Sequence, residues 1–196
     1  MSWLISSVFK DTLERVTGML PAINSDHAYI HYGIGYKAHI EIASLTGANE
    51  YSFKTPSDRY VHFKNVRLTG LGGSAKFSLK RGTEANPLTI NSAGTTPVAG
   101  LTGPHNMNDS KGPEARTEIK AAPTYTDSEE GEVWDVVSIV GDSTNQYTSV
   151  SETQRSDTEE FVMKPDTYYV LRLEKVGIDT PTQVVLSLFF YEEGDG

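Results

Sequence analysis

Apolar and polar side chains alternate with a period of two along most of this chain, and after Pro21 a helical period is almost absent. Such alternation is typical of a β-strand that buries one face and exposes the other. The alternating segments are residues 36–43, 60–69, 75–80, 132–140, 160–164, 167–176 and 182–192. Gly, Pro, Asn and Ser residues between them provide turns. The pattern therefore predicts an almost entirely β protein.

Seven to nine strands of this kind predict an antiparallel β-sandwich, with jelly-roll topology as the leading version. An up-and-down barrel with a long lid loop is the alternative. In residues 60–69 the parity of the apolar positions changes around Asn65, which predicts a bulge or bend. Strand parity also predicts the buried residues. These are Ile40, Ile42, Phe63, Leu68, Phe77, Leu79, Trp134, Val136, Leu171, Leu173, Leu186 and Leu188.

The first twenty residues follow a different pattern. Trp3, Ile5, Phe9 and Leu13 fall largely on one helical face, and Gly18 followed by Pro21 would end such a helix. We therefore expect two parts, a helical arm over residues 1–20 and a β-sandwich domain over residues 21–196. The apolar face of the arm needs a cover, which is either one end of its own sandwich or a groove on another chain.

Alternation is lost between residues 81 and 131, where Pro, Thr, Asn and Gly are frequent. A connection of this length without structure is unusual inside a compact domain. We therefore expect a long loop excursion over 81–131. It should contain one or two short strands, one of them over 115–120, and contacts with a neighbouring chain should do most of the ordering.

Composition excludes several classes of protein. The chain has 17 Lys and Arg against 26 Asp and Glu, for a net charge of −9, whereas nucleic-acid binding needs clustered cations. It has no cysteine, so disulfides, thiolate nucleophiles and sulfur-ligated zinc are ruled out. We find no bilayer-length apolar segment and no basic leader, and expect neither a membrane partner nor a signal peptide. The absence of cysteine also leads us to expect synthesis in the cytoplasm.

No catalytic or metal-binding constellation is evident. Residues 33–38 match a dinucleotide fingerprint by letters, but the residues that follow alternate as a strand, where the motif needs a helix. The acidic run 127–132 lacks the spacing of a calcium loop. His27 and His31 lie in a segment that looks extended, and local hydrogen bonding accounts for the histidines better than metal ligation. We expect no enzyme activity, no cofactor and no metal.

Several motifs carry a family resemblance. They are His27-x-x-x-His31-x-Gly33, residues 51–56 (Tyr-Ser-Phe-Lys-Thr-Pro), 60–63 (Tyr-Val-His-Phe), 160–173 (Glu-Phe-Val-Met-Lys-Pro-Asp-Thr-Tyr-Tyr-Val-Leu-Arg-Leu) and 186–192 (Leu-Ser-Leu-Phe-Phe-Tyr-Glu). Through them the chain resembles a family of tailed-bacteriophage virion structural proteins, discontinuously over residues 27–192. Relatives carry Arg in the long loop, whereas residues 106–110 here are Asn-Met-Asn-Asp-Ser, so contacts by those Arg side chains cannot be transferred.

The resemblance implies a non-enzymatic β-sandwich of the virion, foremost a head decoration (cement) protein that binds and stabilises the outer capsid lattice. Its partners would be the major capsid protein and itself, as a homotrimer on the capsid surface, after synthesis in the host cytoplasm. A minor head protein and a tail or fibre component are competitors. A receptor- or carbohydrate-binding module is another, with an aromatic platform supplied by Tyr60, Tyr125, Tyr147 and Tyr168.

Partner contacts are expected from apolar residues that the core does not need. On the arm these are Trp3, Ile5, Phe9 and Leu13; in the 81–131 segment they are Leu88, Ile90, Val98 and Leu101, joined by the amides of Asn106 and Asn108.

Overall fold

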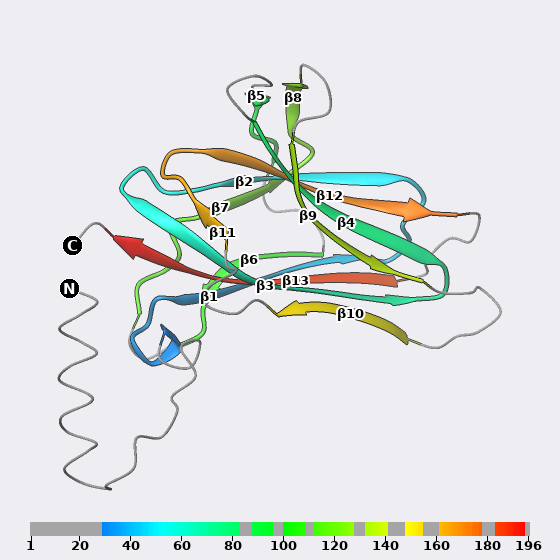
Figure 1. The fold of residues 1–196 in the computed structure, drawn as a ribbon, viewed down its shortest axis with the longest axis horizontal. Coiled ribbons are helices and arrows are strands. Elements are labelled where there is room, and N and C mark those ends of the chain that lie inside the picture. The colour runs from blue at the N-terminus through cyan, green and yellow to red at the C-terminus, as the bar shows by residue number, and fades with distance from the viewer. Residues whose placement is uncertain are drawn as a thin grey trace, which may run out of the picture.

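The computed structural model of the protein describes residues 29–82, 88–95, 100–108, 112–127, 132–140, 148–154, 161–177 and 183–194. Within them, two large antiparallel sheets lie face to face, and a small two-stranded ribbon projects from one side (Figure 1). The predicted all-β sandwich is confirmed. The expected arm over 1–20, with Trp3, Ile5, Phe9 and Leu13, lies outside the described residues, as does Val98.

One helical turn (residues 29–31) precedes the strands. The strands are β1 (Gly35–Ile42), β2 (Ala48–Lys54), β3 (Arg59–Leu71), β4 (Ser74–Arg81), β5 (Leu88–Ser92), β6 (Leu101–Asn106), β7 (Glu118–Ala121), β8 (Thr124–Asp127), β9 (Glu132–Ile139), β10 (Thr148–Gln154), β11 (Phe161–Met163), β12 (Tyr168–Val176) and β13 (Gln183–Gly194).

The strand order is that of a jelly roll. Sheet A runs β10-β3-β13-β1-β6, with β11 also paired to β3, and sheet B runs β7-β2-β12-β4-β9. Without the short strand β11 and the strands β5 to β8 of the 81–131 segment, sheet A consists of β1, β3, β10 and β13, and sheet B of β2, β4, β9 and β12. Eight principal strands connected in this way form the two Greek keys of a jelly roll.

The change of parity near Asn65 is a β-bulge. β13 pairs with β3 in one register as far as Phe189 opposite Asn65; the register then shifts, and Phe190 lies opposite Phe63. Lys64 is the extra residue. The bulge lets β3 keep inward-facing side chains on both sides of it, because Phe63 and Val66 are both fully buried.

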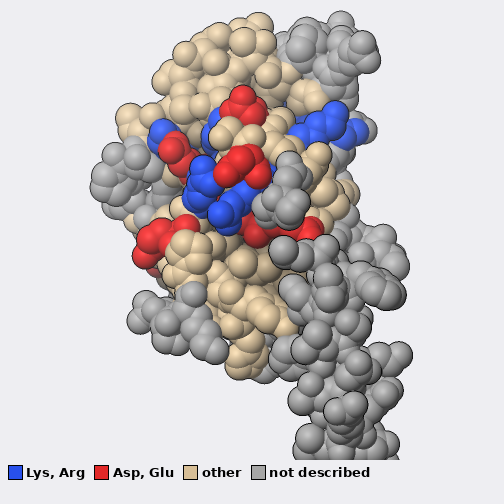
Figure 2. All heavy atoms as spheres, turned by 90° about the vertical axis from the view of Figure 1, so that its left-hand side faces the viewer, with Lys and Arg blue, Asp and Glu red and all other residues tan. Residues whose placement is uncertain are grey.

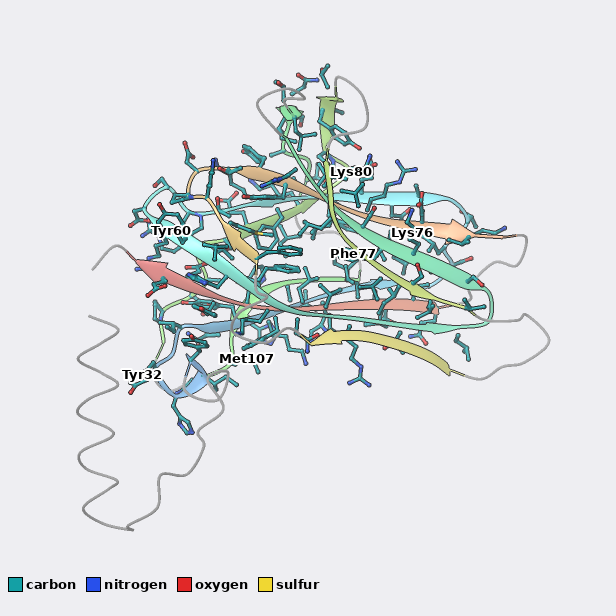
Figure 3. The ribbon with its side chains drawn as sticks, in the orientation of Figure 1. Tyr32, Tyr60, Lys76, Phe77, Lys80 and Met107 are labelled. Carbon is teal, nitrogen blue, oxygen red and sulfur yellow. The ribbon has the colours of Figure 1, made fainter. Side chains whose placement is uncertain are left out.

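The core lies between the two sheets, where Figure 3 places Phe77. Ten of the twelve predicted core residues are buried, namely Ile40, Ile42, Phe63, Leu68, Phe77, Leu79, Leu171, Leu173, Leu186 and Leu188. Trp134 and Val136 lie on β9, but their side chains are outside the description. An edge-to-face aromatic cluster adds to the centre: Phe53 packs on Phe63 and Phe190 with ring centroids 5.9 and 5.4 Å apart.

The segment 81–131 contains more strand than expected. Four strands lie in it instead of one or two: β6 extends sheet A beside β1, β7 extends sheet B beside β2, and β5 and β8 form the projecting ribbon (Figure 1). The strand predicted over 115–120 is β7, at 118–121. All four pair within the chain, so the described strands of this segment do not need a neighbouring chain to order them, contrary to expectation. Their short length hid them from period-two analysis.

Two glycines hold this segment close to the sandwich. Gly94 and Gly100 have φ angles of +94° and +82°, a region that other residues rarely adopt. A Cβ on Gly94 would collide with the carbonyl oxygen of Ala121, and one on Gly100 with that of Glu41. The carbonyl of Gly100 also accepts a 2.7 Å hydrogen bond from the Glu41 amide, which fixes the start of β6.

Candidate interaction surface

Two motifs of the family resemblance meet in space although about 110 residues separate them. Thr55, in the β2–β3 turn, donates its hydroxyl to the Lys164 carbonyl at 2.7 Å and accepts the Thr167 amide at 2.9 Å. The Asp166 amide donates to the Pro56 carbonyl at 2.8 Å, and Lys54 forms an ion pair with Asp166 at 2.6 Å. Asp166 has φ +51°, which Asp tolerates better than most residues. These hydrogen bonds and the ion pair join the β2–β3 turn to the β11–β12 turn.

The motif at residues 186–192 supplies a buried carboxylate, that of Glu192. Glu192, whose side chain is fully buried, accepts three hydrogen bonds on Oε1, from the amides of Arg116 and Thr117 and from the Thr117 hydroxyl, at 2.9, 2.7 and 2.8 Å. Arg59 lies 4.0 Å from its Oε2. This arrangement ties the chain leading into β7 to the end of β13.

Asn106 and Asn108, proposed as partner contacts, have internal roles. The side-chain nitrogen of Asn106 donates to the carbonyls of Gly33 and Pro113 at 2.8 and 2.9 Å. Its side-chain oxygen accepts a hydrogen bond from the backbone amide of Asn108 at 2.7 Å. The Asn108 side chain donates to the His31 carbonyl at 3.3 Å. Both residues join the end of β6 to the segment before β1. The Leu88 and Ile90 side chains on β5 are half-buried, and Leu101 begins β6.

The histidines do not form a metal centre in the described part of the chain. His62 stacks on Tyr191 with ring centroids 4.3 Å apart, and Tyr29 stacks on the same ring at 3.8 Å. His62 also contacts the Glu193 carboxylate at 3.0 Å. His31 is exposed, and His27 lies outside the description. Residues 35–42 form β1, so the dinucleotide-like motif at 33–38 runs into a strand and is a chance match.

The outer face of sheet A carries a groove with a volume of about 410 Å³. One row of its floor crosses β1, β13 and β3 and consists of Lys37, Phe189 and Asn65. The neighbouring row contains Ser187 on β13 and Arg67 on β3. Met107, 38% exposed, forms a wall; Figure 3 shows it on the side of sheet A away from Phe77. Sequence analysis missed this groove, since its residues come together only once the strand order is known.

Two histidines border the groove on adjacent strands. The rings of His39 on β1 and His105 on β6 stack with centroids 6.1 Å apart, and His39 Nδ1 lies 3.0 Å from the Ser187 hydroxyl. Burial lowers the pKa of His39, and the positive charges of Lys37 and His105 lower it further. A neutral imidazole on this face is therefore favoured, because protonation would add a positive charge beside Lys37.

The end of the sandwich that carries the β2–β3 turn faces the viewer in Figure 2, where basic and acidic side chains intermingle. Arg116 pairs with Asp58 at 2.6 Å there, and the Arg116 guanidinium lowers the pKa of that carboxyl. Among the described residues of this end, Lys54 and Arg116 are paired with Asp166 and Asp58, whereas Lys37 and Arg67 of the groove have no such carboxylate partner.

The aromatic platform required for a carbohydrate site is not assembled among the described residues. Tyr60 is 40% exposed on β3. Tyr125 donates its hydroxyl to Glu50 at 2.7 Å, and Lys54 lies over the Tyr168 ring at 4.5 Å. These two residues belong to the ribbon and to sheet B, whereas Tyr60 belongs to sheet A. Tyr147 lies outside the description.

Comparison with known proteins finds no matching family model, curated protein or solved structure. Among the described residues, no helix has the length and apolarity needed to cross a membrane.

Proposed function

We propose that this protein is a non-enzymatic structural component of a tailed-phage virion. Its role would be that of a head decoration, or cement, protein that binds the outer capsid lattice and stabilises it. The major capsid protein is the proposed partner. The proposed assembly is a homotrimer on the capsid surface.

One observation carries the proposal. The sequence blocks that resemble the virion family act together as the framework of the fold: the β2–β3 turn meets the β11–β12 turn, and β13 supplies the Glu192 anchor. A resemblance limited to one short motif would carry little weight, whereas this one covers segments that pair with one another in both sheets, β11 and β13 with β3 and β12 with β2. The resemblance also agrees with a structural role for these blocks, because Thr55 and Glu192 form hydrogen bonds with backbone groups of other segments.

A receptor- or carbohydrate-binding module is the second candidate. Among the described residues it is supported only by the exposed ring of Tyr60, since Tyr125 and Tyr168 are engaged in contacts on other elements. We therefore place it behind the decoration function.

The test is to locate the protein in purified virions by cryo-electron microscopy and to add the pure protein to capsids that lack it. Density on the outer head lattice and saturable binding to undecorated capsids are expected. Density restricted to the tail or fibres would overturn the proposal. Failure to bind capsids together with selective glycan binding would favour the receptor-binding module instead.

A further inference from the structure

The groove on the outer face of sheet A contains two basic side chains, Lys37 and Arg67, that have no acidic partner among the described residues. Neither Lys37 nor Arg67 forms an ion pair with a carboxylate of the described residues. Glu41, on the same face of β1, has its carboxylate bound to the Gln183 amide at 2.7 Å. Glu152 lies opposite Arg67 on β10, and its side chain is outside the description. On a chain of net charge −9, this groove is a local exception.

The remaining lining suits a peptide. The hydroxyls of Thr69 and Ser187 can hydrogen-bond a backbone, the Ser187 hydroxyl in addition to its contact with His39, while Phe189 and Met107 offer apolar surface. The floor spans three strands and three successive outward-facing rows of β13, or about 10 by 13 Å at ordinary strand spacings. That length accommodates about four residues of extended chain at about 3.3 Å per residue.

We propose that this groove binds an extended acidic peptide segment of a partner protein, with carboxylates at Lys37 and Arg67 and an apolar side chain against Phe189 and Met107. Charge complementarity selects the ligand, because the groove presents cations and hydrogen-bond donors. A small inorganic anion would leave the apolar wall unused. The proposal does not depend on the virion role, since it concerns the chemistry of one face.

The probe is a fluorescein-labelled peptide of sequence Glu-Glu-Leu-Glu-Glu, titrated with the full-length protein and followed by fluorescence anisotropy. We expect saturable binding that weakens as salt is raised to about 0.15 M, because the contacts are partly exposed charge pairs. A peptide with Lys in place of every Glu should not bind. Absence of binding by the Glu peptide, or equal binding of both peptides, would overturn the proposal.

Variants separate the groove from general electrostatics. Lys37→Gln and Arg67→Gln should each weaken binding about fivefold, and the double variant at least tenfold. Lys76→Gln is the matched control, since Lys76 lies on the outer face of sheet B and is already paired with Glu174 at 3.2 Å. It should bind like the wild type, and an equal loss in Lys76→Gln would overturn the assignment.

The apolar wall is tested by Met107→Ala. This change should weaken binding of the Leu-containing peptide and leave a Glu-Glu-Gly-Glu-Glu peptide unaffected. Displacement of the labelled peptide by inorganic phosphate at concentrations similar to those of unlabelled peptide would mean a simple anion site, and would also overturn the proposal. Circular dichroism of each variant establishes that it is folded.

Discussion

At the scale of single residues, Glu192 places a carboxyl group in the interior of the sandwich. Glu192 satisfies three donors of the segment before β7 through one oxygen, in a place that water does not reach. Removing a buried acceptor leaves its donors without a hydrogen bond. The resulting loss in the free energy of unfolding exceeds the net contribution that those hydrogen bonds made to it. Glu192 therefore attaches the 81–131 segment to the C-terminal strand.

We expect Glu192→Ala to lower the free energy of unfolding by about 3 kcal/mol, because two amides and one hydroxyl lose their acceptor. Glu192→Gln should cost less, since its side-chain oxygen can still accept. Urea denaturation measures both changes. If the alanine variant is as stable as the wild type, the carboxylate does not anchor this segment.

Two buried tyrosines make a matched pair. The Tyr36 hydroxyl has no hydrogen-bond partner among the described residues, and burial raises its pKa, as does the nearby Glu192 carboxylate. Tyr36→Phe should leave stability unchanged or raise it by up to about 1 kcal/mol. Tyr169→Phe should instead cost about 1 kcal/mol, because the Tyr169 hydroxyl accepts the Lys164 amide at 3.1 Å. Thermal unfolding of the two variants in parallel gives the comparison.

At the scale of elements, the attachment of β6 depends on one glycine. Gly100→Ala places a methyl group against the Glu41 carbonyl at a φ of +82°, and should destabilise the protein by about 2–3 kcal/mol. Gly47→Ala is the control, because nothing lies within 4 Å of its Cβ position, and its effect should be small. Hydrogen exchange should show the loss of protection in β6 first. Equal effects of the two changes would contradict this account.

The junction of β1 and β6 should also respond to pH. Burial, followed by the charges of Lys37 and His105, holds the folded-state pKa of His39 below its ordinary value. Between that pKa and about 6.5 the unfolded chain binds more protons than the folded one, so stability rises with pH and falls on acidification from about pH 7 toward pH 5. His39→Gln should flatten part of this dependence, and an unchanged pH dependence in this variant would contradict the account. Thermal unfolding across this range is the measurement.

At the scale of the whole molecule, the sandwich and the N-terminal arm should be separable. Deleting residues 1–20 should weaken capsid binding and leave the β spectrum of the sandwich intact, because the described strands form a complete jelly roll without the arm. Sedimentation with capsids measures binding, and circular dichroism measures folding. A truncated chain that binds as tightly as the full one would remove Trp3, Ile5, Phe9 and Leu13 as anchors.

Strand parity predicted the core well, because whether a residue faces inward depends on its immediate neighbours in sequence. Parity alone did not assign each strand to its place in the predicted jelly-roll order, since β1 pairs with β13 and β2 with β12 across most of the chain. The groove was missed for the same reason: Lys37, Arg67 and Ser187 become neighbours only through that order. The hydrogen bonds of Asn106 and Asn108 could not be predicted either, because their acceptors Gly33 and His31 are distant in sequence.

The jelly-roll order has a consequence for the timing of folding on the ribosome. The two principal neighbours β1 and β13 are separated by about 140 residues, which take on the order of ten seconds to synthesise at typical rates. Until β13 is synthesised, β1 can pair only with the edge strand β6. In the same way, β2 has no partner on its inner side until β12 is synthesised. The nascent chain thus carries exposed strand edges for most of its synthesis, so mutations that slow the closing of sheet A should reduce soluble yield before they reduce the stability of the finished protein.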